Sequence, residues 1–287
     1  MDIKIAFMGT SYFAVPILNN LIKKGFNVVC VLTQQDKPKG RGKKLSISPV
    51  KEEALKNNLK IFQPASKNDI FSILKDEQVD LAVIASYGMI LNKDVTDNYL
   101  CLNIHPSVLP KYRGPSPIQT TLLNGDTETG ITLMVTEEKL DAGDIIVQEK
   151  IKIEENDNSE GLTKKLAELG GVAAYKFIDK IKSEKIVKEN IINRFGKKQN
   201  EAEATYTKKI QKEDCLIDWG KTSKDIHNLV RAMYPWPGAY TVVDGKRIKI
   251  IKTNIDKEEK LELIIVQPEG KKEMRYKDYL LGNPKII

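Results

Sequence analysis

The first half of the chain repeats one pattern, in which a short apolar run is followed by a stretch with the spacing of an amphipathic helix. We expect strands at residues 3–8, 28–33, 61–62, 81–85 and 101–104, separated by helices at 14–24, 50–58 and 70–75. Apolar, β-branched runs that alternate with helices are typical of βαβ units, whose parallel strands are covered by helices on both faces. The pattern therefore predicts an α/β domain built on a Rossmann-like, mostly parallel sheet.

The strand expected at 101–104 leads to the most informative residues of the chain. Asn103 and His105 end an apolar run, and the prolines that follow at positions 106, 110, 115 and 117 favour a stiff, irregular loop. Side chains alternate along a strand, so Asn103 and His105 point to the same side. An amide and an imidazole at the carboxyl end of a strand can polarise a carbonyl group and move a proton. A packed histidine and a turn asparagine are the plain alternatives, but the shared side favours a catalytic site.

A carboxylate that could orient the imidazole lies downstream. Residues 130–136 alternate like a strand, and residues 140–148 read as a turn that leads into the next strand. This turn contains Asp141 and Asp144. Either acid could merely cap the turn, and either could hold His105 as the aspartate of a catalytic triad holds its histidine.

The net charge of +7 is concentrated in the last third of the chain. Residues 1–184 hold 24 basic and 24 acidic residues, whereas residues 185–287 hold 22 basic and 15 acidic residues, an excess of seven. Charge asymmetry of this kind suggests a part that faces a polyanion, although most lysines on any protein are only solvated.

The pattern also suggests two domains. A helix at 159–181 has a broad apolar face, and residues 183–213 then turn polar and charged. We expect a catalytic domain at 1–185, a linker at 186–208 and a basic second domain at 209–287. Short β runs at 239–243, 247–252 and 261–266 suggest that the second domain is a small β-barrel.

Composition indicates a globular protein, with 41% apolar and 30% charged residues. Cys30, Cys101 and Cys215 are widely spaced and predict neither a disulfide framework nor a zinc site. No run approaches the roughly 20 apolar residues that span a bilayer. The first residues read as a strand rather than a signal peptide. We therefore expect a cytoplasmic protein that needs no membrane and no metal.

Several separate motifs, met in order along the chain, resemble the folate-dependent formyltransferases. The clearest is Asn-x-His-x-Ser-x-Leu-Pro-x-Tyr-Arg-Gly-x-x-Pro-Ile at 103–118, with Leu-Asp-x-Gly-Asp at 140–144. The other matching stretches are residues 9–10, 35–45, 48–51, 85–91, 166–169, 217–219 and 235–237. The resemblance runs from residue 3 to about residue 282, and within the family the chain is most similar to the members that act on methionyl-tRNA.

The resemblance implies a reaction and its site. It implies that the formyl group of 10-formyltetrahydrofolate is transferred to the α-amine of methionyl-initiator-tRNA, in support of translation initiation. Asn103, His105 and Asp141 match the catalytic residues of the family, with Asp144 as the second choice of aspartate. The folate is expected in an apolar cleft. Its walls would be Ser107, Val108, Leu109 and Pro110 on one side and Tyr87, Gly88, Met89, Ile90 and Leu91 on the other.

The resemblance also concerns the acceptor. Residues 36–44 carry five basic residues and one acid, and the matching loop of the family is implicated in tRNA recognition. Arg41 matches its key arginine, and with Lys43 and Lys44 it is expected to contact phosphates. An ordinary solvated loop is the alternative. The family's second domain resembles an oligonucleotide-binding barrel, and here it is shorter, because residues 252–260 lead almost directly to the run at 261–272.

Two other functions remain open at this point. A sugar-nucleotide or purine-precursor formyltransferase would share the Asn, His and Asp, but only a large polyanionic acceptor explains the basic loop and the basic second domain. A non-enzymatic nucleic-acid binder would leave the Asn103–His105 arrangement unexplained. We expect a monomer.

Overall fold

The computed structural model describes residues 3–39, 44–183 and 186–286. It forms two compact units, each made of several chain segments. The first unit comprises Met1–Arg113, Gly130–Lys150 and Lys164–Thr205, and the second comprises Gly114–Thr129, Ile151–Thr163 and Tyr206–Ile287. Within the described ranges, no helix has both the length and the apolar character needed to cross a membrane.

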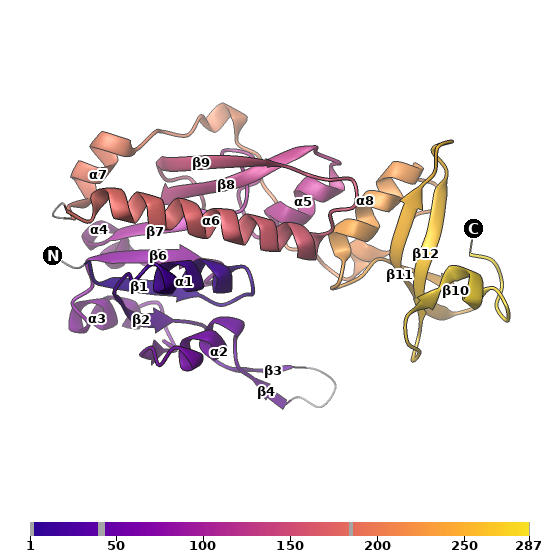
Figure 1. The fold of residues 1–287 in the computed structure, drawn as a ribbon, viewed down its shortest axis with the longest axis horizontal. Helices are drawn as coiled ribbons and strands as arrows, with labels where there is room; N and C mark the ends of the chain where they lie inside the picture. The colour runs from indigo at the N-terminus through magenta and orange to yellow at the C-terminus, as the bar shows by residue number, and fades with distance from the viewer. Residues whose placement is uncertain (1–2, 40–43, 184–185, 287) are drawn as a thin grey trace. The chain divides into compact units, whose positions relative to one another are not determined.

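The first unit is built on a seven-stranded sheet with the order β5-β2-β1-β6-β7-β8-β9 (Figure 1). The strands are β1 (Ile5–Gly9), β2 (Val28–Leu32), β5 (Ile61–Phe62), β6 (Leu81–Ala85), β7 (Leu100–His105), β8 (Glu128–Val135) and β9 (Ile145–Lys152). Strands β5, β2, β1, β6 and β7 run parallel, and β8 is antiparallel to β7. The expected mostly parallel sheet is confirmed. The chain turns from β1 toward β2 on one side and later reaches β6 on the other, so the topological switch point lies between β1 and β6.

Helices cover both faces of this sheet. They are α1 (Ala14–Lys23), α2 (Pro49–Lys56), α3 (Asp69–Asp76), α4 (Lys93–Asn98), α6 (Ser159–Ile181) and α7 (Lys188–Phe195). On one face, Ile70 of α3 and Val95 of α4 share a buried cluster with Cys101 of β7. On the other face, α6 lies so close to β7 that a Cβ added at Gly170 would come within 2.6 Å of Ile104. Burial on both faces explains why the strands read as continuous apolar runs.

The region expected to be a linker, residues 186–208, is partly structured and extends the first unit. Helix α7 buries Ile191, and Phe195 packs edge-on against Phe177 of α6 with ring centroids 5.3 Å apart. These apolar contacts tie the segment to α6, and the first unit therefore continues to Thr205. The second unit likewise includes residues 114–129 and 151–163, which differs from the expected boundaries because these segments pack with residues distant in sequence.

The second unit combines helices with an antiparallel sheet. Its elements are α5 (Pro117–Leu123), α8 (Ser223–Met233), β10 (Tyr240–Val243), β11 (Lys246–Ile255), β12 (Leu261–Pro268), β13 (Met274–Arg275) and α9 (Tyr276–Tyr279). The sheet order is β10-β11-β12-β13, and in the described residues β10 and β13 do not pair with each other. The expected small antiparallel C-terminal domain is confirmed, and β11 passes to β12 through the short connection that the sequence predicts at residues 252–260.

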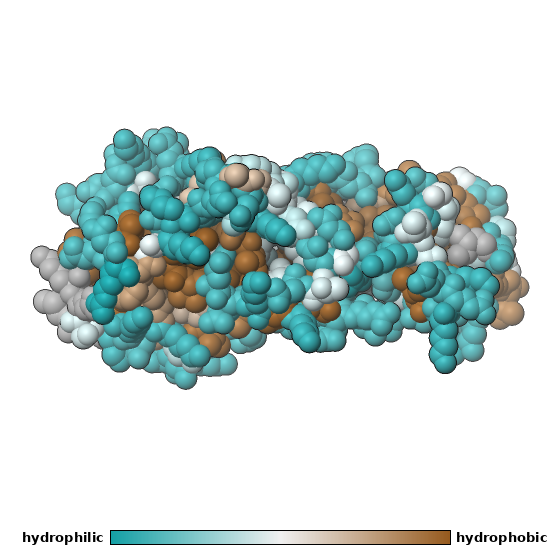
Figure 2. All heavy atoms as spheres, turned by 90° about the horizontal axis from the view of Figure 1, so that it is seen from above, coloured by the Kyte–Doolittle hydropathy of each residue, from teal (hydrophilic) through white to brown (hydrophobic). Residues whose placement is uncertain are grey.

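Hydrophilic residues cover most of the face shown in Figure 2, with hydrophobic groups in patches between them. The large apolar side chains that are exposed include Tyr12, Ile90, Trp236 and Leu281. Scattered exposure of this kind is usual on a folded protein and needs no special explanation.

Candidate active site

His105 is buried at the carboxyl end of β7, between β6 and β8. Its Nε2 donates a hydrogen bond to the Tyr112 carbonyl at 2.9 Å, and its Nδ1 lies 3.6 Å from Oδ2 of Asp141. The Tyr112 carbonyl can only accept, so Nε2 of His105 carries a proton, while Nδ1 faces the Asp141 carboxyl group.

The two acids of the 140–144 turn have different partners. Asp141 is 9% exposed and faces His105, with its backbone in the left-handed region at a φ of 50°. Asp144 instead lies 3.4 Å from Nζ of Lys198. Of the alternatives left open by the sequence, this pairing favours Asp141 as the acid that orients the imidazole.

Asn103 lies two residues before His105, on the same side of β7. Cys101, two residues earlier, points to the same side of β7 and belongs to the buried cluster on the face covered by α3 and α4. Ile104 points to the other side and faces α6. Asn103 is half-buried, and its side-chain amide makes no hydrogen bond to any residue that the structure describes. The amide is therefore available to a ligand.

The loop after His105 is held by two polar residues that the sequence did not single out. Oγ1 of Thr132, on β8, donates to the Ser107 carbonyl at 2.7 Å and accepts from the Leu109 amide at 3.1 Å. Nε2 of Gln148, on β9, donates to the Leu109 carbonyl at 2.7 Å. The sequence signal that could have identified them is a polar residue within each of two runs that otherwise read as strands. These bonds hold residues 107–109 in one backbone conformation.

The second expected folate wall begins where β6 ends, beside β7. Tyr87 and Leu91 pack into the buried cluster, whereas Ile90 is 69% exposed, so the five residues do not present a single apolar surface. Burial raises the pKa of the Tyr87 phenol. The Gly88 carbonyl accepts from Nε2 of Gln34 at 2.6 Å, at a φ of 77° that suits glycine. Because β6 and β7 are parallel neighbours, the stretches 87–91 and 107–110 leave the same edge of the sheet.

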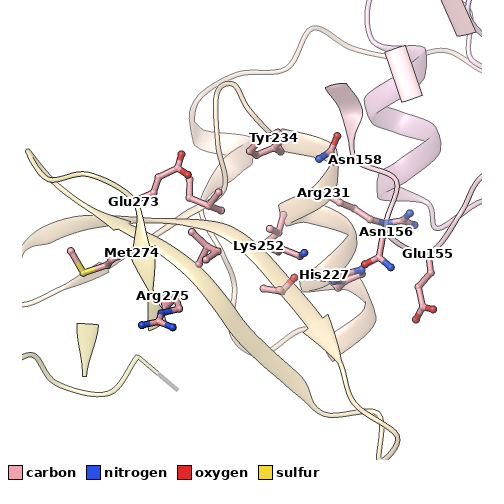
Figure 3. A pocket seen from close by; sticks show the side chains of 14 residues that line it. Glu155, Asn156, Asn158, His227, Arg231, Tyr234, Lys252, Glu273, Met274 and Arg275 are labelled. Carbon is pink, nitrogen blue, oxygen red and sulfur yellow. Dashed lines mark hydrogen bonds between the residues drawn. The ribbon is translucent and has the colours of Figure 1, made fainter. Parts of the chain in front are cut away.

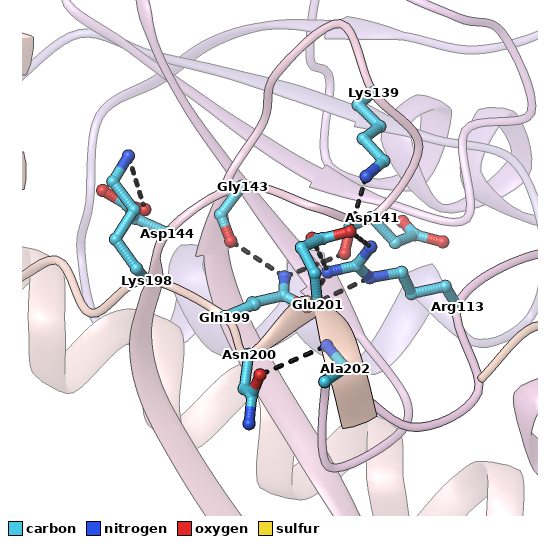
Figure 4. A network of polar contacts seen from close by, with 10 residues as sticks. All are labelled: Arg113, Lys139, Asp141, Gly143, Asp144, Lys198, Gln199, Asn200, Glu201 and Ala202. Carbon is cyan, nitrogen blue, oxygen red and sulfur yellow. Dashed lines mark hydrogen bonds and ion pairs between the residues drawn. The ribbon is translucent and has the colours of Figure 1, made fainter. Parts of the chain in front are cut away.

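A polar network supports the Asp141 turn and includes residues that the sequence analysis missed (Figure 4). Arg113 is fully buried and pairs with Glu201, which also contacts Lys139. Gln199 lies between Arg113 and the backbone of the turn. The hydrogen bonds from Arg113 and then from Lys139 lower the pKa of the Glu201 carboxyl to about 2.

The basic stretch at 36–44 does not remain an irregular loop throughout. Strands β3 (Lys37–Lys39) and β4 (Lys44–Ser46) pair antiparallel. At the start of this hairpin, Asp36 pairs with Lys51 at 2.6 Å, which lowers the pKa of the Asp36 carboxyl. Arg41 and Lys43 lie outside the described residues, and Lys44 begins β4.

The second unit contains a cavity of about 450 Å³ whose lining includes none of the expected site residues (Figure 3). It is lined by Glu155, Asn156, Asn158, His227, Val230, Arg231, Tyr234, Ile251, Lys252, Thr253, Ile265, Glu273, Met274 and Arg275. Nδ1 of His227 lies 2.9 Å from Oγ1 of Thr253, and burial lowers the pKa of this histidine. No group of three or more possible metal ligands gathers in the described parts of the chain.

The fold is an open, mostly parallel α/β sheet, and the family models identify the chain as a transferase. Residues 3–178 match the family described as formyl transferase, and residues 209–262 match the formyl transferase C-terminal domain. The chain belongs to the formyl transferase family.

Individual relatives and solved structures show which members of the family the chain is similar to. A methionyl-tRNA formyltransferase of Caldanaerobacter subterraneus is 39% identical over 98% of this chain and 97% of its own. The methionyl-tRNA formyltransferase of Bacillus subtilis is 38% identical over 97% and 94%. Among solved structures, an N-formyltransferase of Helicobacter canadensis in complex with folinic acid and dTDP-3-aminofucose has a TM-score of 0.65 at 25% identity, covering 88% of each chain. A methionyl-tRNA formyltransferase of Clostridium thermocellum shares the fold at a TM-score of 0.60 and 17% identity, covering 93% of this chain and 98% of its own.

Proposed function

We propose that this chain transfers the formyl group of 10-formyltetrahydrofolate to the α-amine of methionyl-initiator-tRNA. The observation that carries the proposal is the Asn103, His105 and Asp141 arrangement at one strand end, in a chain 39% identical to a methionyl-tRNA formyltransferase over nearly its whole length. The proposed acceptor is a charged tRNA, which is consistent with a cytoplasmic enzyme. Every group in the mechanism below comes from one chain, which is consistent with a monomer.

In this mechanism the amine nitrogen attacks the formyl carbon, and negative charge develops on the formyl oxygen. The free amide of Asn103 donates to that oxygen. Nε2 of His105 donates as well, and for this its proton must leave the Tyr112 carbonyl, which it contacts at 2.9 Å. Such exchanges are common because catalytic hydrogen bonds often form only when substrate is bound. Asp141 keeps the imidazole oriented and helps to take the proton from the attacking amine. This proton is returned to the folate nitrogen as its bond to the formyl carbon breaks, so that neutral tetrahydrofolate leaves.

The formyl donor is proposed to lie between the loop at 107–110 and the stretch at 87–91. Ser107, Val108, Leu109 and Pro110 form one wall, and their backbone is already fixed by Thr132 and Gln148. Ile90, which is exposed, is the residue of the other stretch that is best placed to cover an apolar ring. A similar protein has been solved with folinic acid, which supports a folate as the donor. The chemistry requires no metal.

The acceptor is proposed to meet the basic hairpin β3–β4. Arg41, Lys43 and Lys44 would contact phosphates, and the excess positive charge of residues 185–287 would attract the tRNA from a distance. A small sugar nucleotide is the acceptor suggested by the 25%-identical Helicobacter canadensis structure, and it has too few phosphates to contact all of these charges.

A competition between acceptors tests the proposal. The enzyme is incubated with 10-formyltetrahydrofolate and equal amounts of methionyl-initiator-tRNA, methionyl-elongator-tRNA and dTDP-3-aminofucose. We expect formylmethionine to form on the initiator tRNA faster than any other product. Formylation of the amino sugar without formylation of charged tRNA would reject the proposal, as would RNA binding without any folate turnover.

A further inference from the structure

We propose that Gln199 is a positioning residue, which holds the Asp141 carboxylate against His105. Gln199 lies between the two stretches that match the family, in a segment whose sequence reads as a polar linker. Its Nε2 donates to two carbonyls of the aspartate turn, Asp141 at 2.8 Å and Gly143 at 2.9 Å (Figure 4).

The other end of the same amide is anchored to a buried cation. Oε1 of Gln199 accepts from Nε of Arg113 at 3.1 Å and from Nη2 at 2.8 Å. Glu201 closes the guanidinium on its remaining side, with Nη2 to Oε1 at 2.7 Å. The partners therefore fix which way the amide points, because only its oxygen can face Arg113 and only its nitrogen can face the two carbonyls.

This anchoring acts directly on the residue that faces the imidazole. Asp141 has a φ of 50°, a backbone conformation that few residues other than glycine adopt without support. Holding the carbonyls of residues 141 and 143 fixes the peptide planes of the turn. The direction of the Asp141 side chain, and its 3.6 Å approach to His105, follow from those planes.

The same segment also supports the second partner of the imidazole. Oγ1 of Thr205 accepts from the Tyr112 amide at 2.8 Å, and the Thr205 carbonyl accepts from the Arg113 amide at 2.8 Å. The Tyr112 carbonyl is the acceptor for His105. Gln199 thus supports Asp141, and Thr205 supports Tyr112, the two residues that hold the His105 ring. Gln199 is bonded directly to the backbone of Asp141 and is therefore the residue that positions the carboxylate.

Two substitutions separate positioning from folding. Gln199→Glu keeps an acceptor for Arg113 but removes the donor to the two carbonyls. Gln199→Met removes both contacts without adding charge, and leaves Arg113 paired with Glu201. Asn200→Ala is the matched control, since Asn200 is exposed and, among the residues that the structure describes, its side chain forms hydrogen bonds only with Ala202 and Glu203 of the following turn.

The first readout is independent of turnover. The chain has two histidines, so NMR can follow the ring signals of His105 with those of His227 as an internal reference. Oδ2 of Asp141 lies 3.6 Å from Nδ1 of the His105 ring. We expect the His105 ring signals to change in Gln199→Met, because the displaced carboxylate no longer lies beside Nδ1. The His227 signals should stay in place, and Asn200→Ala should match the wild type.

The second readout rests on the proposed function. In formyl transfer to methionyl-tRNA, we expect kcat of both Gln199 variants to fall by roughly 10- to 100-fold, with KM for both substrates within a few fold of the wild type. Wild-type His105 ring signals in Gln199→Met, or a wild-type kcat in Gln199→Glu, would overturn the inference. If the wild type forms no formylmethionine but the His105 ring signals change as expected in Gln199→Met, the proposed function fails and the positioning role stands.

Discussion

At the scale of single residues, the proposed reaction depends on the Asn103 amide, which has no hydrogen-bond partner among the described residues, and on the His105 imidazole, which has two neighbours that hold it. Asn103 makes no hydrogen bond within the described residues, which is unusual for a half-buried amide and fits a group reserved for a ligand. His105 is instead held on both sides by groups that accept. The amide is thus ready to donate, and the ring must exchange a partner to do so.

Replacing the amide should affect the rate more than the binding of substrates. For Asn103→Ala we expect a loss of about 2.7–4 kcal/mol of transition-state stabilisation, or roughly 10²- to 10³-fold in kcat, as for other oxyanion donors. Single-turnover formylation at saturating substrates measures this directly. Asn98→Ala is the control, because Asn98 is exposed and its amide donates only to the Asp94 carbonyl. A kcat within a few fold of the wild type would remove Asn103 from the mechanism.

Gly143, two residues after Asp141, has no room for a side chain. A Cβ at Gly143 would lie 1.8 Å from the Val135 carbonyl oxygen, which is backbone and cannot turn aside. We expect Gly143→Ala to destabilise the protein by about 1–3 kcal/mol, as overpacking does, and to lower kcat by displacing the turn. Urea unfolding measures the first effect. Gly282→Ala, where nothing lies within 4 Å of the added carbon, should unfold like the wild type. Equal unfolding midpoints for the two variants would contradict this explanation.

At the scale of elements, the order of strands and helices in the first unit follows from the sequence, and the supports of the site do not. Continuous apolar runs predict buried parallel strands because a strand covered on both faces needs apolar side chains on both of its sides. The network of Arg113, Gln199 and Glu201 joins positions 86 and 88 residues apart through single polar side chains. Such a contact leaves no periodic pattern in the sequence. The segment that holds the Asp141 turn therefore reads as a linker.

The Arg113–Glu201 pair should leave a signature in acid unfolding. The pKa of Glu201 is lowered to about 2 by Arg113 and Lys139, from a model-compound value of 4.5. As the pH falls, Glu201 is therefore protonated in the unfolded chain at a higher pH than in the folded protein. The contribution of the pair to stability is complete above about pH 5 and is lost progressively toward about pH 2.

Urea unfolding of Glu201→Gln across this range checks the expectation. The variant should be less stable than the wild type near neutral pH, and the difference should shrink as the pH falls through the window. Glu203→Gln, in the same short turn but bonded only to Asn200 in the structure, is the control and should show no such convergence. A difference that stays constant with pH would show that the carboxylate charge does not matter.

At the scale of the whole molecule, positive charge is unevenly distributed along the chain, and its distribution does not follow the two compact units. The excess of seven positive charges falls entirely within residues 185–287, which contribute to both compact units. The basic residues were read correctly from the sequence as a feature of that region. The shortened antiparallel sheet of the second unit was also predicted, because the short connection between β11 and β12 is visible in the sequence and leaves no room for further strands.

This charge should make binding to tRNA strongly dependent on salt. Each phosphate neutralised by a lysine or arginine releases counterions, so the logarithm of the affinity falls linearly with the logarithm of the salt concentration. We expect the affinity for methionyl-initiator-tRNA to fall by at least about tenfold between low and moderate salt. Fluorescence anisotropy with labelled tRNA measures the slope. An affinity that is the same at both concentrations would exclude electrostatic attraction as the main source of binding.

The most direct test of the central claim is the product of one turnover. Charged initiator tRNA and 10-formyltetrahydrofolate are mixed with excess enzyme, and the amino acid is then released from the tRNA and identified by mass. We expect formylmethionine with the wild type, and almost none with Asn103→Ala/His105→Ala although this variant still binds both substrates. Unmodified methionine with the wild type, or formylmethionine formed equally fast by the double variant, would contradict this claim.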